Sequence, residues 1–249
     1  MRNALLSRLD SCPHPHHEVL CFPHAGGSAS YFQRWAQQLP AGVALRALQL
    51  PLREERLDDD PISDMRMLIS QLMEELANLP PRPRILFGHS MGATVAWELA
   101  LAMQHSGNPV CKLFVSGQTP PDRQRQTQFH LASNQALITE VSRFSATSAS
   151  VFEFPALREL VLGQLRHDYA LIECWQPTSS MTLTSPITVL HGTEDSEVNE
   201  PEARRWANFT LNDFKLLSWP GDHFYLTTHW QAVLRCLMQE LTPLPLDMP

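Results

Sequence analysis

The chain contains the stretch Ile85-Leu86-Phe87-Gly88-His89-Ser90-Met91-Gly92-Ala93, and a sequence that favours a helix continues from there to residue 100. The first three residues form an apolar run typical of a buried strand. Between strand and helix lies the pattern G-x-S-x-G, which is typical of a tight, strained turn that exposes a serine hydroxyl. Such a turn excludes bulky side chains on both sides of the serine, and glycine occupies both positions. The stretch predicts Ser90 as a nucleophile, against the alternative of a chance match in an ordinary strand–helix turn.

The rest of the chain repeats this alternation of strand and helix. Short apolar runs predict buried strands at residues 19–22, 45–50, 85–88, 113–116, 187–191 and 214–218. The clearest amphipathic helix is expected over residues 61–78, with Asp60 as its N-cap and Pro61 at its first position. Its apolar face collects Ile62, Met65, Ile69, Leu72 and Leu76. The alternation predicts an α/β fold in which helices flank a mostly parallel sheet.

One long stretch, residues 119–184, contains no convincing strand. It opens with two prolines and then shows helical patterns around residues 132–141 and 156–174. Insertions of this kind in a doubly wound fold usually lie over the carboxyl ends of the strands, where ligands bind. We therefore expect a single domain over residues 1–249 with a helical lid insertion at residues 119–184.

A serine nucleophile needs a base and an acid, and in the α/β-hydrolase fold they follow it in the order acid, then histidine. Asp195 lies in the loop expected after the strand at residues 187–191, and His223 lies in the loop after the last strand. Glu194 is a rival to Asp195 because both occupy one short loop, and a purely structural role for His223 is the alternative. We expect structural roles for His89, beside the serine, and His191, at a strand end. His229 falls within the terminal helix, and Asp222 is too close in sequence to His223 to face its ring easily.

An acyl-transfer site also needs N–H donors for the oxyanion. The residue after the nucleophile, Met91, supplies one of them in this fold. The loop Phe22-Pro23-His24-Ala25-Gly26-Gly27 follows an early strand and could supply the second, because its two glycines allow a close approach to substrate. A phosphate-binding loop is disfavoured, since the loop lacks G-x-G-x-x-G and the P-loop lysine, and a plain turn is the remaining alternative.

Composition limits the function further. The 249 residues carry a formal net charge of −7, which argues against nucleic acid as a partner. Five widely spaced cysteines without a CxxC pair indicate a reducing compartment and no metal framework. No apolar run has the length of a membrane span or of a signal-peptide core. We expect a cytoplasmic protein without membrane contact, metal or cofactor.

Several motifs taken together resemble the type II thioesterases, the free-standing editing hydrolases of nonribosomal peptide and polyketide synthesis. The resemblance runs from about Val19 to Leu241 and rests on Phe22–Gly27, Phe87–Ala93, Glu98–Ala100, Phe114–Gly117, Leu165–Tyr169, Pro186–Asp195 and Pro220–Phe224. It implies Ser90, Asp195 and His223 as a catalytic triad, with the backbone N–H groups of Ala25 and Met91 as the oxyanion hole.

The resemblance also implies a substrate and a partner: acyl groups held as thioesters on the phosphopantetheine arms of acyl or peptidyl carrier proteins. We expect the protein to act as a monomer. A carboxylesterase of small esters and a catalytically silent binding protein are the alternatives. Local arginines near the predicted lid, namely Arg123, Arg125, Arg143 and Arg166, are candidates for carrier docking. One departure from the family is Leu52, where relatives usually have a glycine between proline and arginine.

Overall fold

The computed structural model describes residues 4–144, 150–177 and 182–241. Its centre is a seven-stranded sheet with the order β1-β3-β2-β4-β5-β6-β7. Every neighbouring pair is parallel except β1 and β3, which are antiparallel. The strands are β1 Leu6–Arg8, β2 His17–Phe22, β3 Val43–Leu48, β4 Arg84–His89, β5 Lys112–Ser116, β6 Ile187–Gly192 and β7 Phe214–Trp219. The predicted mostly parallel α/β sheet is confirmed.

The register of the parallel strands places their carboxyl ends at one edge of the sheet. Phe22 of β2 pairs with Gly88 of β4, and His89 of β4 pairs with Ser116 of β5. Because β6 and β7 continue the same parallel array, the loops after β2, β4, β5, β6 and β7 leave the sheet at this edge. Those loops carry every residue that the sequence predicted for catalysis.

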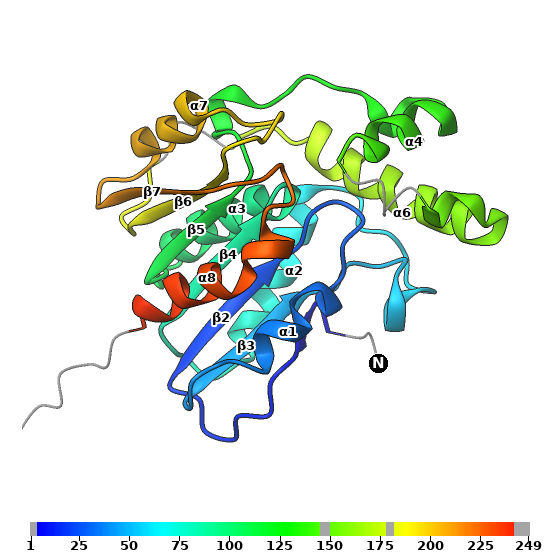
Figure 1. The fold of residues 1–249 in the computed structure, drawn as a ribbon. Coiled ribbons are helices and arrows are strands. Elements are labelled where there is room, and N and C mark those ends of the chain that lie inside the picture. The colour runs from blue at the N-terminus through cyan, green and yellow to red at the C-terminus, as the bar shows by residue number, and fades with distance from the viewer. Residues whose placement is uncertain (1–3, 145–149, 178–181, 242–249) are drawn as a thin grey trace, which may run out of the picture.

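Helices cover both faces of the sheet (Figure 1). On one face, α1 Gln33–Ala36 and α8 Leu226–Gln239 pack around a cluster that includes Phe32, Trp35 and Phe87. On the other face, α2 Met65–Ala77 and α3 Met91–His105 pack around a larger cluster that includes Trp97 and Trp206. The short helix α7 Glu200–Arg204 contributes to the second cluster through Ala203. These two apolar layers hold the sheet between them.

The start of α2 differs from the prediction. The helix begins at Met65, and its N-cap is Asp64, whose carboxylate accepts a hydrogen bond from the Met67 N–H at 2.8 Å. Asp60 and Pro61 lie outside the helix, so their predicted capping roles were wrong. The reason is that Ile62, although in register with the helix face, reaches the core from the connecting segment before the helix begins.

Strand β1 was missed by the sequence reading because its three residues are too few to show a periodicity. Tertiary contacts hold it instead. The carboxylate of Glu75 on α2 accepts hydrogen bonds from the N–H groups of Leu5 (2.7 Å) and Leu6 (3.0 Å), while Leu6 pairs with Leu48 of β3. This strand exists because a side chain from about seventy residues away fixes its backbone.

Between β5 and β6 the chain forms the helices α4 Asn134–Ser142 and α6 Pro155–Glu173, as the helical patterns predicted. We call residues 119–184 the cap segment. In Figure 1 its two helices lie at the upper right, outside the two helical layers of the sheet. They have a small apolar cluster of their own, formed by Leu137, Phe152, Leu162 and Leu165. No named strand occurs in the described part of this segment.

Among the helices of the described residues, none is both long enough and apolar enough to cross a membrane.

Candidate active site

Ser90 lies alone between β4 and α3 in a strained backbone conformation, with φ 55° and ψ −125°. Its N–H donates to the Ser116 carbonyl and its own carbonyl accepts from Ala93 N–H, both at 2.8 Å. A Cβ on Gly88 would lie 2.2 Å from the Gly92 carbonyl oxygen, and one on Gly92 would lie 2.1 Å from that of Phe22. The flanking glycines are therefore required by close packing, and strain of this kind is typical of functional sites.

His223 and Asp195 face each other across the ends of β7 and β6. Nδ1 of His223 is 3.0 Å from Oδ2 of Asp195, and both residues are buried. Oδ1 of Asp195 accepts from the Glu197 N–H at 2.8 Å, which fixes the carboxylate. With Nδ1 directed at a carboxylate, the imidazole presents Nε2 for proton transfer. Glu194, the sequence rival, is exposed and makes its contact through its backbone N–H to the Gly221 carbonyl.

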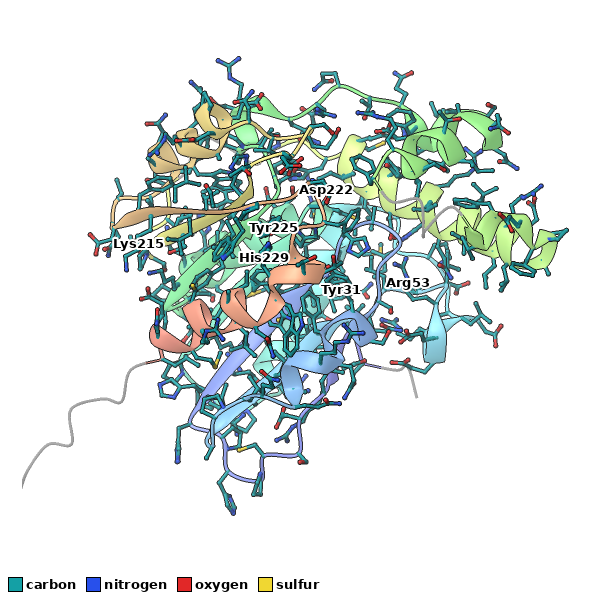
Figure 2. The ribbon with its side chains drawn as sticks, in the orientation of Figure 1. Tyr31, Arg53, Lys215, Asp222, Tyr225 and His229 are labelled. Carbon is teal, nitrogen blue, oxygen red and sulfur yellow. The ribbon has the colours of Figure 1, made fainter. Side chains whose placement is uncertain are left out.

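The other candidates have different partners. Asp222, labelled in Figure 2 at the turn between β7 and α8, is exposed and accepts from the Phe224 N–H. His191 lies 2.9 Å from the Val198 carbonyl through Nε2. His229, farther along α8, lies 3.0 Å from the Pro220 carbonyl. None of these contacts is with Ser90 or His223.

His89 is buried behind the site. Its Nδ1 lies 2.9 Å from Ser116 Oγ, which in turn lies 2.7 Å from the hydroxyl of Tyr225, and its ring centre is 5.1 Å from that of His223. Burial lowers the pKa of His89 well below its ordinary value, and burial lowers that of His24 to about 4, with His223 adding to both shifts. Both rings are thus neutral near pH 7.

The loop after β2 forms a tight turn in which the Gly27 N–H donates to the His24 carbonyl and Gly26 has a φ of 79°. Within the described ranges, the Ala25 N–H has no hydrogen-bond acceptor. Ala25 and Met91 line the same cavity as Ser90 and His223. A free N–H and the first N–H of α3 are groups that could stabilise an oxyanion.

A buried ion pair behind this loop was not predicted. The guanidinium of Arg53 donates to both carboxylate oxygens of Asp168 on α6, at 2.7 and 2.9 Å. Asp168 also accepts from the Gly26 N–H at 2.7 Å and contacts Nδ1 of His167 at 3.0 Å, while Arg53 donates to the Gly27 carbonyl at 2.7 Å. We call this set the Arg53–Asp168 clamp. It ties the cap segment to the loop that carries Ala25.

Arg53, labelled in Figure 2, lies below α6 in that view. Burial raises the pKa of Asp168, but the Arg53 charge and the hydrogen bonds outweigh it and leave the pKa below its ordinary value. Two signals were available in the sequence, since Arg53 follows the unusual Leu52 and Asp168 lies in a family motif. Neither signal revealed the pairing, because the two residues are 115 positions apart.

Leu52, which departs from the family pattern expected from the sequence, has a φ of 68°. This left-handed conformation strains an ordinary side chain by about 1–2 kcal/mol, whereas glycine adopts it without that strain. Leu52→Gly should therefore raise the free energy of unfolding by about 1 kcal/mol, measured by urea denaturation. Leu57→Gly is the matched control: Leu57 has an ordinary φ of −57°, so glycine should lower stability there. A loss of stability in both variants would contradict the strain at Leu52.

The cavity at Ser90 has a volume of about 400 Å³. Ser90, Met91, His223 and the loop after β2 form one side of it. Its far side comes largely from the cap segment, with the apolar side chains Phe129, Val141, Phe144, Val151, Phe152, Val161, Leu165, Tyr169 and Ile172. Three carboxylates, those of Glu140, Glu173 and Glu197, also line it. The cavity is thus shaped for a mainly apolar group attached to a reactive carbonyl near Ser90.

The parallel sheet, the strained turn at Ser90 and the histidine–carboxylate pair define a hydrolase of the α/β-hydrolase fold. The chain belongs to the thioesterase family: the model of the thioesterase domain matches residues 17–241. The resemblance inferred from the sequence motifs is thereby confirmed.

Individual relatives agree with the family model. A probable cadicidin biosynthesis thioesterase from Streptomyces griseus is 33% identical over 225 residues; the match covers 90% of this chain and 62% of that protein, less than two thirds of its length. Thioesterase PikA5 from Streptomyces venezuelae is 31% identical over 239 residues, covering 95% of this chain and 85% of that protein.

Solved structures give the same result. The type II thioesterase BorB, from the borrelidin biosynthetic cluster, matches with a TM-score of 0.88 at 33% identity, covering 97% of this chain and 99% of that one. YbtT, a type II thioesterase from the yersiniabactin NRPS/PKS pathway, matches with a TM-score of 0.83 at 27% identity, covering 95% and 98%. A serine-to-alanine mutant of YbtT is also among the matching structures. The predicted serine hydrolase class agrees with these relatives.

Proposed function

We propose that the chain is a type II thioesterase that hydrolyses aberrant or stalled acyl groups from the phosphopantetheine arms of carrier proteins. The observation that carries the proposal is the convergence of the strained Ser90 and the His223–Asp195 pair on one apolar cavity. The relatives support the substrate class, since BorB and YbtT are named as type II thioesterases of biosynthetic pathways.

The proposed reaction has two steps. His223 takes the proton of Ser90 as the hydroxyl oxygen attacks the thioester carbonyl, and Asp195 holds the imidazole in position. The N–H groups of Ala25 and Met91 stabilise the oxyanion, and the carrier thiol leaves with the proton from His223. Water, deprotonated by His223, then attacks the carbonyl of the acyl ester; the bond to Ser90 Oγ breaks, His223 returns the proton to that oxygen, and the acid is released.

The cap segment serves in this proposal as the lid of a single domain. Support comes from its side chains, which form most of the apolar side of the cavity where the acyl chain would lie. We also propose that the enzyme acts as a monomer in the cytoplasm; the five free cysteines, all within the described ranges, suit a reducing compartment. The chemistry proposed uses only protein groups, without metal or cofactor.

The arginines considered for carrier docking are mostly engaged within the chain. Arg125 and Arg143 both form ion pairs with Glu197, and Arg166 donates to the His130 carbonyl. Arg123 is exposed, and its side chain has no partner in the part of the chain that the structure describes. Arg123 is therefore the best placed of the four to meet an acidic carrier.

The substrate class can be tested by comparing kcat/KM for an acyl group presented as a carrier-protein thioester and as a p-nitrophenyl ester. Because the proposed site is specialised for release of a carrier thiol, the thioester should be preferred by about a hundredfold or more. The same acyl group on free pantetheine separates recognition of the arm from recognition of the carrier. A strong preference for the small ester would instead favour a carboxylesterase.

A further inference from the structure

A second cluster of a thiol, an imidazole and a carboxylate lies at the carboxyl end of α6. Cys174, the C-cap residue of α6, has its Sγ 3.8 Å from Nε2 of His130. Nδ1 of the same ring lies 2.6 Å from Oε2 of Glu173. This is the arrangement in which a base, oriented by a third group, activates a cysteine. None of the three residues has a role in the hydrolysis proposed above.

The carboxylate of Glu173 orients the imidazole ring of His130. The same carboxylate accepts from Thr127 Oγ1 (2.6 Å), Phe129 N–H (2.8 Å) and His130 N–H (3.0 Å). Burial raises the pKa of Glu173, but these hydrogen bonds prevail and leave the pKa below its ordinary value. An ionised carboxylate keeps the proton of His130 on Nδ1, so the lone pair of Nε2 is directed toward the sulfur.

Cys174 is reachable from solvent. It is exposed, and it lines a groove of about 670 Å³ that is separate from the cavity at Ser90. The groove lies between α2, α3 and the end of α6, with Asp64, Ile69, Leu101 and Trp175 along it. A small molecule can therefore approach the sulfur without entering the acyl cavity.

The other cysteines provide a contrast. Cys21 is fully buried, and burial raises the pKa of its thiol well above the ordinary value. Cys111, like Cys174, is exposed. Partial burial nevertheless raises the pKa of its thiol, and no imidazole of the described residues bonds to it. Exposure alone would make Cys111 and Cys174 similar, so the imidazole is what distinguishes them.

We propose that Cys174 is a thiol modification site that exchanges with disulfides of small thiols. His130 Nε2 takes the proton of Cys174 as the sulfur attacks one sulfur of the disulfide R–S–S–R. The S–S bond of the reagent breaks, a new bond forms between Cys174 and one R–S group, and the other R–S group leaves with the proton as R–SH. The reagent itself is the oxidant, so electrons and protons balance.

Modification at this position acts on the wall of the acyl cavity. Thr127, Phe129 and Glu173 all line that cavity, and the Glu173 carboxylate that orients His130 also fixes the backbone from Phe129 to His130. Because His130 Nε2 lies 3.8 Å from the sulfur, a group attached to Cys174 crowds the His130 ring and so disturbs this wall. Occupancy of Cys174 therefore lowers acyl hydrolysis, an effect that rests on the proposed function, whereas the reactivity of the thiol does not.

The reactivity is tested with oxidised glutathione, following each cysteine by peptide mass spectrometry. Near pH 7, Cys174 should be modified at least about tenfold faster than Cys111, and His130→Gln should remove most of that advantage. Cys111 serves as an internal reference, since an unchanged rate there shows that the variant is folded. Equal rates at Cys174 and Cys111 in the wild type, or no effect of His130→Gln, would overturn the proposal.

The effect on hydrolysis is tested separately with the same reagent. Glutathione attached to Cys174 should lower turnover of an acyl thioester several-fold, and dithiothreitol should restore it. Cys174→Ser should keep the untreated rate and lose the sensitivity. Equal inhibition of Cys174→Ser would place the effect at another cysteine and overturn the link to the cavity. A wild type without any thioesterase activity would refute the proposed function and leave the reactivity result standing.

Discussion

Ser90→Ala is expected to lower kcat for acyl-thioester hydrolysis by about a million-fold. The variant removes the hydroxyl of Ser90, which lines the cavity together with His223, and it leaves the backbone donors in place. Alanine is as strained as serine at a φ of 55°, so stability should change little. Steady-state hydrolysis of an acyl carrier protein, together with labelling by a fluorophosphonate, measures the effect.

The matched control is Ser106→Ala at the opposite end of α3. Ser106 is exposed, and its hydroxyl donates to the Met103 carbonyl at 2.8 Å, at the end of the helix far from the turn at Ser90. This variant should hydrolyse the substrate at the wild-type rate. If Ser90→Ala retained near-normal hydrolysis, or if the fluorophosphonate label appeared on another serine, the assignment of the nucleophile would be wrong.

The second large effect is expected from Asp168→Ala, which leaves the buried Arg53 guanidinium without its partner. Removal of one member of a buried ion pair costs about 3–5 kcal/mol of stability, more than the pair itself contributes. The Gly26 N–H also loses its acceptor, so the loop that carries Ala25 is released and turnover should fall as well. Urea denaturation and kcat measured on the same preparations separate the two effects.

Two further variants show whether the loss of stability comes from the unpaired charge and the loss of turnover from the released loop. Glu200→Ala breaks an exposed pair with Arg204 and should cost no more than about 0.5 kcal/mol. The double variant Arg53→Met/Asp168→Leu removes both charges, so stability should return, while turnover should remain low because Gly26 still lacks its acceptor. Recovery of turnover in the double variant would show that the clamp does not position the loop.

The clamp also predicts how the cost of Asp168→Ala varies with pH. Because the pKa of Asp168 is depressed in the folded protein, its ionised form stabilises the fold above the unfolded-state pKa of about 4. That contribution is lost as the pH falls through the lower folded-state value. The stability difference between wild type and Asp168→Ala should therefore be greatest near neutrality and shrink in acid.

The sequence predicted those features that repeat locally along the chain. Apolar runs located the six parallel strands to within a few residues, and the glycines around Ser90 marked the turn that the structure shows to be strained. Features held by distant partners were not accessible. Strand β1 depends on Glu75, and the choice of Asp64 over Asp60 as N-cap depends on where Ile62 meets the core.

In the candidate site, too, locally encoded features could be predicted and features that depend on distant partners could not. Loop positions at the carboxyl ends of strands could be read from the chain, whereas the Arg53–Asp168 clamp joins two segments that no local pattern connects. Asp195 and Glu194 are neighbours with similar chemistry, and the burial of one against the exposure of the other distinguishes them. Burial of a single loop residue is a tertiary property, so the sequence favoured Asp195 but could not exclude Glu194.

The separate apolar cluster of the cap segment has an evolutionary consequence. Leu137, Phe152, Leu162 and Leu165 pack mainly against one another, apart from the layers that hold the sheet. Phe152 of this cluster also lines the acyl cavity, so exchanging it reshapes that space while the turn at Ser90 keeps its support. Acyl preference can thus drift between lineages by mutation of the cap alone, with the reaction chemistry inherited unchanged.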